Sequence, residues 1–225
     1  VQDAIPIKTL WEDGIFLVGK NKYSKCYKFS DINYAVASRD DKEAMFLEYS
    51  ELLNSFETGA TTKITITNRR LNKVDFEKTI ILPMEKDELD KYREEYNKML
   101  LSKVSGANGI IQEKYITISI DKKSIEEARS YFARVGTDLI NHFKELGSNC
   151  VELDAVERLR ICHDFYRVGE ETYFNFDMVD NMRKGHSFKD FICPDTIEVE
   201  SDHIKIGNRY GRVIFLKEYA SYIKD

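Results

Sequence analysis

The chain has 225 residues, of which 42% are hydrophobic and 32% charged, and its formal net charge is −5. This composition allows one large domain or two small ones with a buried core, and the acidic balance argues against a free-standing protein that coats nucleic acid. No apolar run approaches the ~20 residues of a membrane-spanning helix, and no signal-peptide pattern opens the chain. Because the chain starts at Val1 rather than Met, we expect it to be a piece of a longer protein.

The N-terminal part predicts a β-meander, with strands at 15–18, 23–29 and 32–37. Arg39-Asp40-Asp41 then marks the start of a helix, and residues that recur at helical spacing predict its buried face. That face consists of Met45, Tyr49, Leu52, Leu53 and Phe56.

The alternation over 63–67 predicts the next strand, with 76–82 as its hairpin partner or an extended arm. Residues 87–104 predict a second amphipathic helix with a densely charged solvent face. Its apolar face is expected to contain Leu89, Tyr92, Tyr96, and Met99 or Leu100.

The clearest pattern covers 114–147. A strand with one buried face is predicted at 115–120, where apolar and hydroxylated residues alternate. Ser124 and Glu127 then form a capping box, an apolar stripe continues to Leu146, and Gly147 occupies the position where a left-handed residue ends a helix. A stripe of this length must be buried, and the sheet that contains the preceding strand is the expected surface.

The remaining sequence predicts a brief strand at 150–153, a helix from Asp154 and a short helix at 176–184. The helix from Asp154 is expected to turn Leu159, Cys162, and Tyr166 or Phe165 inward. Strands are then predicted at 196–200, 203–206 and 213–216 as a C-terminal antiparallel β-region.

Together these elements predict an α+β fold, namely a ferredoxin-like (split βαβ) sandwich with helix 87–104 as an insertion. We expect an α+β sandwich with its N-terminal meander over 1–153. The helix and β-region over 154–225 should pack on it as one unit.

Residues 14–20 spell G-x-x-x-x-G-K, the outline of a phosphate-binding loop. Asn21 stands where that loop needs Ser or Thr for magnesium, and Ile15–Val18 favour extended backbone rather than a tight loop. We therefore expect no phosphate site and no bound cofactor here.

Thiol and metal chemistry have little support in the sequence. Cys162 and His163 look like a nucleophile and its base, but adjacent helix residues point about 100° apart. His142 is interpreted as a hydrogen-bonded packing residue, and the acidic residues form no metal-type run. The scattered cysteines, which are expected to be reduced thiols, do not have zinc-ligand spacing. We expect no catalytic residue and no metal site.

The lysines at 20, 22, 25 and 28 alternate with Tyr23, Tyr27 and Phe29. One interpretation is a small basic and aromatic patch that binds single-stranded DNA. The other, which the acidic net charge favours, is an exposed edge hairpin whose lysines prevent aggregation.

Two stretches resemble a known family. They are 154–167, and 188–219 with its "DFICP" at 190–194 and "YGRVIFLKEY" at 210–219. Together they are similar to the N-terminal region of the VirB-type (TraC/TrbE-like) ATPases of conjugation and type IV secretion, in the form carried by integrative elements of Gram-positive bacteria.

The resemblance implies a motor domain of RecA type, with ATP and magnesium, downstream of Asp225. No catalytic residue can be carried over to this chain. It also implies a cytoplasmic location at the inner face of the cell membrane, with other secretion-channel proteins, the downstream ATPase domain and further copies of the chain as partners. Nucleic acid is not an expected partner, and the 13 Tyr and 13 Phe suit protein contacts. We expect a scaffold function, with contact residues at Arg209, Tyr210, Arg212 and Tyr219.

Overall fold

The computed structural model describes residues 1–70, 81–106 and 110–218. The fold is mixed α/β with antiparallel sheets. The chain divides into two compact units, Pro6–Arg158 and a smaller one that joins Val1–Ile5 to Leu159–Asp225. The division thus falls inside helix α5 (Ala155–Tyr166), a little beyond the predicted boundary at 153/154.

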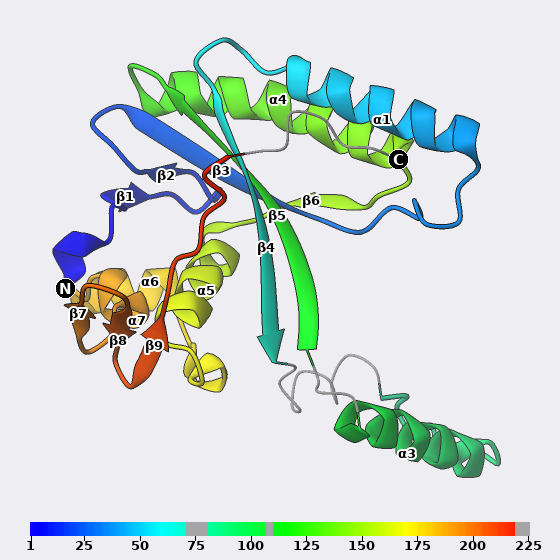
Figure 1. The fold of residues 1–225 in the computed structure, drawn as a ribbon. Helices are drawn as coiled ribbons and strands as arrows, with labels where there is room; N and C mark the ends of the chain where they lie inside the picture. Colours follow the sequence, from blue (N-terminus) through cyan, green and yellow to red (C-terminus); the bar gives the residue numbers. More distant parts are fainter. Residues whose placement is uncertain (71–80, 107–109, 219–225) are drawn as a thin grey trace. The chain divides into compact units, whose positions relative to one another are not determined.

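The larger unit contains one antiparallel sheet (Figure 1). In the described residues its strand order is β1-β2-β3-β5-β4, and β6 also pairs with β3. The strands are β1 (Thr9–Leu10), β2 (Phe16–Leu17), β3 (Lys22–Phe29), β4 (Thr61–Arg70), β5 (Ile110–Asp121) and β6 (Cys150–Glu152). The central pairing sets Tyr23 opposite Ile120 and Tyr27 opposite Ile116. The predicted alternation is confirmed, because Ile116, Ile118 and Ile120 are all buried.

Helices α1 (Arg39–Asn54) and α4 (Ile125–Glu145) lie side by side along the sheet (Figure 1). Ser124 Oγ accepts the Glu127 N–H at 3.3 Å, as predicted, while the Glu127 carboxylate accepts from the Lys123 N–H at 3.2 Å. Gly147 follows with φ +76°. The predicted apolar stripe of α4 is buried through Ala128, Phe132, Val135, Leu139, Phe143 and Leu146, with Ile125 partly buried. Tyr131, which the stripe did not include, is buried as well.

Helix α1 buries fewer side chains than α4 does. Leu52 is its one buried side chain, and Met45, Tyr49 and Phe56 are partly buried against the same core. Leu53, which was predicted to be buried, is exposed. The predicted face was therefore one residue too wide, because Leu53 lies about 100° around the helix from Leu52.

Gly136 lets α4 approach β3 closely. A Cβ atom at this position would lie 2.7 Å from the Tyr27 hydroxyl and 2.7 Å from Glu152 Oε1. The buried Tyr27 hydroxyl donates to the Phe132 carbonyl at 3.4 Å. The glycine therefore makes room for the tyrosine that joins the sheet to the helix.

The smaller unit combines short helices with a three-stranded antiparallel sheet, β7 (Ile197–Val199), β8 (Ile204–Ile206) and β9 (Arg209–Gly211). Its helices are η1 (Gln2–Ala4), the later part of α5, η2 (Glu171–Tyr173), α6 (Met178–Lys184) and α7 (Lys189–Ile192). Lys189 Nζ donates to the carbonyls of Gln2 at 3.0 Å and Ile5 at 3.1 Å. These bonds join the N-terminal residues to α7.

Inside this unit, Leu159 of α5 and Ile192 of α7 are fully buried. Of the other α5 residues that were predicted to face inward, Cys162 and Tyr166 are partly buried, whereas Phe165 is exposed.

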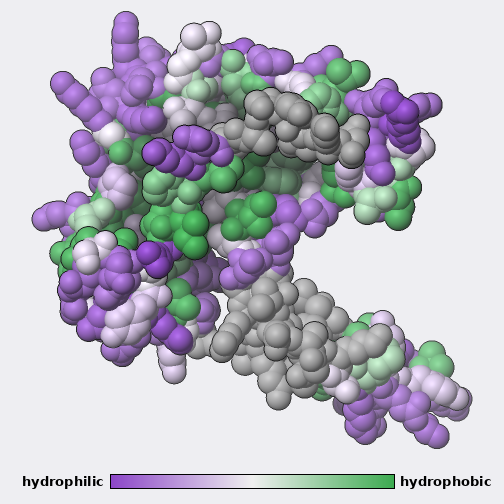
Figure 2. All heavy atoms as spheres, viewed as in Figure 1, coloured by the Kyte–Doolittle hydropathy of each residue, from purple (hydrophilic) through white to green (hydrophobic). Residues whose placement is uncertain are grey.

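Helix α3 (Asp90–Gly106) begins three residues after the predicted position, and the Asp87 carboxylate accepts the Leu89 N–H at 3.0 Å in the turn before it. Arg93 forms ion pairs with Glu85, Asp87 and Asp90. The predicted apolar face is mostly exposed: of its described members Leu100 is partly buried, whereas the other four are 43–66% exposed. They are Leu89, Tyr92, Tyr96 and Met99. Figure 2 shows apolar and polar residues together on the surface of this helix.

Two predicted strands are not found in the structure. Residues 32–37 are not a strand, because the Ser30 N–H already bonds to the Asn149 carbonyl and a turn follows, closed by the Ala37 N–H on the Tyr34 carbonyl. Residues 213–216 follow β9 without a pairing partner in the described chain. Strand β4 pairs with β5. Most of 76–82 lies outside the described residues, so the strand predicted there stays a prediction.

Candidate functional site

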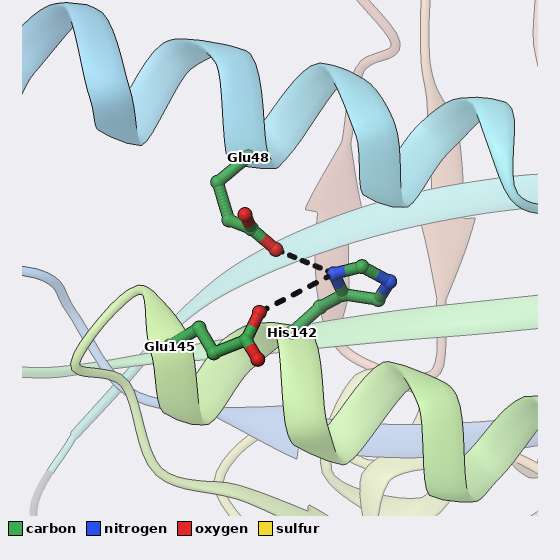
Figure 3. A group of neighbouring side chains, drawn as sticks. All are labelled: Glu48, His142 and Glu145. Atoms are coloured by element: carbon green, nitrogen blue, oxygen red, sulfur yellow. Dashed lines mark hydrogen bonds and ion pairs between the residues drawn. The ribbon is translucent and has the colours of Figure 1, made fainter.

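A histidine and two glutamates meet where α1 faces α4 (Figure 3). His142 and Glu145 are three residues apart on α4 and therefore share a face of that helix. Glu48 reaches them from α1, next to Tyr49, which packs on the core. The packing of α1 on α4 thus brings together groups that are 94 positions apart in the chain.

Both carboxylates point toward one atom of the ring. His142 Nδ1 lies 2.5 Å from Glu48 Oε1 and 4.0 Å from Glu145 Oε2. In Figure 3 the other ring nitrogen points away from both glutamates. The hydrogen bond with His142 lowers the pKa of Glu48, and desolvation opposes that effect. The expected hydrogen bond of His142 is therefore present, with a carboxylate as its partner.

This cluster was not anticipated from the sequence, which predicted no metal-type group. Within the described parts of the chain, it is the one group of three or more His, Cys, Asp or Glu side chains whose ligand atoms all lie within 4.8 Å of one another. The only local signal is the H-x-x-E spacing of His142 and Glu145. Nothing in the sequence indicates that Glu48 lies beside them.

The G-x-x-x-x-G-K segment has a structural role in the larger unit. Phe16 and Leu17 are in strand β2, so the segment is extended as expected. Gly14 has φ +77°, and a Cβ there would lie 2.0 Å from the Leu153 carbonyl oxygen. Its own carbonyl accepts from Arg158 Nη1 at 2.6 Å, and the same nitrogen donates to the Ser24 carbonyl at 2.7 Å. The buried Arg158 therefore joins the first turn of α5 to this turn.

His163 has the surroundings of a packing residue. The side chain is buried, its Nδ1 lies 3.4 Å from Asp164 Oδ1, and its ring centroid is 5.1 Å from that of Phe174. Cys162 is partly buried. The interpretation that Cys162 and His163 do not form a catalytic pair stays a prediction.

The lysine and tyrosine hairpin is neither an exposed patch nor a sheet edge. Strand β3 lies between β2 and β5, and Tyr23 and Tyr27 are buried. Lys25 forms an ion pair with Glu152 at 2.7 Å, and Lys28 forms one with Glu113 at 2.7 Å. The interpretation as an edge hairpin is therefore wrong, and binding of single-stranded DNA by these residues stays a prediction.

The predicted contact residues are on or after β9. Arg209 and Tyr210 are in this strand, Arg212 directly follows it, and all three are exposed. The Tyr210 ring lies 5.4 Å from the His203 ring. Tyr219 lies outside the described residues. The contact role of these residues stays a prediction.

An open hollow of about 560 Å³ lies beside the N-terminal half of α4. It is lined by two cations and three glutamates. Lys122 forms an ion pair with Glu57 at 3.2 Å and lies 4.8 Å from the centroid of the Tyr131 ring, and the Arg134 guanidinium lies 5.9 Å from the same centroid. Because the Lys122 charge is balanced within the protein, the hollow is a weaker candidate than the cluster on α1 and α4.

Among the described residues, no helix has both the length and the apolar composition that crossing a bilayer requires. In comparisons with known proteins, no family model and no curated protein matches the chain.

Proposed function

We propose that this chain is the non-catalytic N-terminal scaffold domain of a conjugative DNA-transfer ATPase of the type IV secretion class. The proposal starts from the sequence resemblance over 154–167 and 188–219. In it, the domain holds the motor at the cytoplasmic mouth of the secretion channel, against the inner face of the membrane. ATP and magnesium bind to the downstream domain, and the partners are channel proteins and further copies of the chain.

The observation that carries the proposal is an exposed apolar run after β9. The side chains at 213–216 are 66–89% exposed, and they are Val213, Ile214, Phe215 and Leu216. Burial of one such side chain is worth about 1.5–3 kcal/mol, so a run of four favours packing on another protein surface. The run belongs to the "Y-x-R-x-I-x-L-x-x-Y" stretch that leads, in the resembling family, into the rest of the protein.

We also propose that the larger unit is a ferredoxin-like sandwich. Its elements follow the order β3, α1, β4, β5, α4, β6, and the corresponding sheet order is β6-β3-β5-β4 with antiparallel neighbours. This order supports a split βαβ arrangement with the segment around α3 inserted between β4 and β5.

The test is the double substitution Ile214→Asp and Phe215→Asp in the full-length protein. We expect the transfer frequency of the element to fall at least tenfold. The melting temperature of the 225-residue chain should not change, because both side chains are exposed in it. Val199→Asp is the matched control, since Val199 is also apolar and 75% exposed but lies in β7. Normal transfer by the double variant would contradict the proposal.

Single-stranded DNA binding by the lysine hairpin remains the alternative, with less support. Tyr27 is fully buried and Lys25 is held by Glu152, so these two side chains are not available to stack on a base or to bind a phosphate, whereas Lys20 is exposed. Salt-sensitive retention of a labelled oligonucleotide on a filter, lost on charge reversal of Lys22 and Lys25, would favour the alternative.

A further inference from the structure

We propose that Glu48, His142 and Glu145 bind a divalent transition-metal ion of the zinc class, which clamps α1 onto α4. This inference does not depend on the scaffold function. It starts from the donor set, which is one imidazole nitrogen and two carboxylates from two helices. Such mixed nitrogen and oxygen ligands suit zinc and its neighbours, whereas magnesium and calcium prefer oxygen alone.

The spacing of the donors can adjust to a metal ion without movement of the helices. Bonds of about 2.0–2.2 Å at tetrahedral angles place two ligand atoms roughly 3.3 Å apart. The distance from His142 Nδ1 to Glu48 Oε1 is 2.5 Å and would have to lengthen, while that to Glu145 Oε2 is 4.0 Å and would have to shorten. Each change is under about 1 Å and lies within the reach of a glutamate rotamer.

The charges also favour a cation at this point. Two carboxylates face one ring nitrogen, and the single proton on that nitrogen can be donated to only one of them. A divalent ion that replaces this proton bonds to both carboxylates and balances their two negative charges. The proton leaves for the solvent, and water completes the coordination.

The metal ion would join α1 to α4 at a contact in which α1 buries little apolar surface. Helix α1 has sixteen residues, but Leu52 is its one buried side chain. A metal bonded to Glu48 on α1 and to two residues on α4 adds a cross-link between the helices. Ligand binding to the native state alone raises stability, so the ion should raise the melting temperature.

The test is titration of the full 225-residue chain with zinc chloride by isothermal calorimetry. Cys162→Ser serves as the background because Cys162 is the most exposed of the four thiols. Burial raises the pKa of Cys26 and Cys193, and that of Cys150 to about 12, so these thiols compete poorly for metal. Magnesium chloride is titrated in parallel.

We expect one zinc ion to bind per chain. The affinity for zinc should fall at least tenfold in each of the variants His142→Gln, Glu48→Gln and Glu145→Gln. Magnesium should produce no heat of binding. Zinc at a hundred times its dissociation constant should raise the melting temperature by about 5 °C. His203→Gln is the matched control, because His203 Nδ1 lies 2.8 Å from Asp202 Oδ1, which makes it a histidine beside one carboxylate only.

The absence of saturable zinc binding would overturn the proposal. Binding that persists in all three variants, or that is lost in His203→Gln, would do the same. Glu145→Gln keeps the test independent of folding, because the Glu145 side chain is 66% exposed. With cobalt in place of zinc, a thiolate charge-transfer band would assign the ion to cysteine and likewise overturn the proposal.

Discussion

At the residue scale, a few buried polar side chains join parts of the chain that are distant in sequence. Arg158 donates to the carbonyls of Gly14 and Ser24 and to Ser24 Oγ, and its guanidinium carbon lies 3.9 Å from the centroid of the Phe16 ring. Its planar group with five donors matches this set of acceptors, and a lysine ammonium does not. The contact explains why a motif that looks like a phosphate loop has a structural role.

We expect Arg158→Ala to lower the free energy of unfolding by about 2–3 kcal/mol, because a hydrogen bond from a charged group contributes about 1.5–3 kcal/mol. Arg158→Lys should recover less than half of the loss. The measurement is urea unfolding followed by circular dichroism. Arg160→Ala, at an exposed position of the same helix, should change stability by less than about 0.5 kcal/mol.

The Glu48 carboxylate makes the stability of the protein depend on pH in the acidic range. Its pKa is lowered from 4.5 in the folded state, mainly by the hydrogen bond with His142, and Glu145 acts in the same direction. A lowered folded pKa contributes stability that is present above the unfolded value and is lost as the pH falls through the folded value.

Glu48→Gln should therefore reduce the melting temperature at pH 6 and have little effect at pH 3. The check is a series of thermal melts from pH 7 to pH 3. Glu51→Gln, an exposed position on the same helix, is the control and should show no such convergence. Equal losses for Glu48→Gln at both ends of the series would contradict the assigned role.

At the element scale, α4 organises the larger unit. Its capping residues, its buried stripe and its terminal glycine are all local, and all are found as the sequence predicts. Gly136 is the exception, since a glycine inside a helix normally costs about 1 kcal/mol relative to alanine. The structure explains it by the close approach of the Tyr27 hydroxyl.

Gly136→Ala should therefore destabilise the protein by about 1–3 kcal/mol, despite the better helix propensity of alanine. The added methyl group would lie 2.7 Å from the hydroxyl of the fully buried Tyr27 and 2.7 Å from Glu152 Oε1. Chemical denaturation measures the effect, and Asp138→Ala, at an exposed site two positions later, is the control. Recovery of stability in the double variant Gly136→Ala, Tyr27→Phe would identify the hydroxyl as the cause.

At the scale of the whole molecule, the core cluster lies in one of the two units. Its fully buried members include Tyr27, Ile116, Phe132 and Leu139, all of which fall between Pro6 and Arg158. The smaller unit has its own buried residues, among them Leu159 and Ile192. Each unit therefore has the beginnings of an independent core.

We expect a fragment that covers 6–166 to fold alone, since it retains the core cluster and the whole of α5. It should show a cooperative thermal transition and a near-ultraviolet circular dichroism spectrum with fixed aromatic bands. The same fragment with Leu139→Ala should lose about 2–5 kcal/mol of stability, which verifies that the transition reports this core. A fragment without a cooperative transition would show that the units depend on each other.

The sequence by itself determined the local elements. Helix α4, the buried face of β5 and most of α1 could be predicted, because each depends on the spacing of nearby residues and on caps next to them. Where a prediction from residue spacing was wrong, the missing information was which distant segment would pack against the element. Residues 32–37 have the composition of a strand but no strand to pair with, and α3 has an apolar face that no described residue covers.

Only the tertiary structure decided the pairing of β4 with β5, the burial of Lys25 beside Glu152 and the meeting of Glu48 with His142. The residues in each of these contacts are dozens of positions apart, and no local periodicity encodes which distant residue will be the neighbour. The physical reason is that burial of the apolar faces of α1 and α4 sets how the two helices pack. The polar groups along the edge of that contact then take the positions that the packing leaves to them.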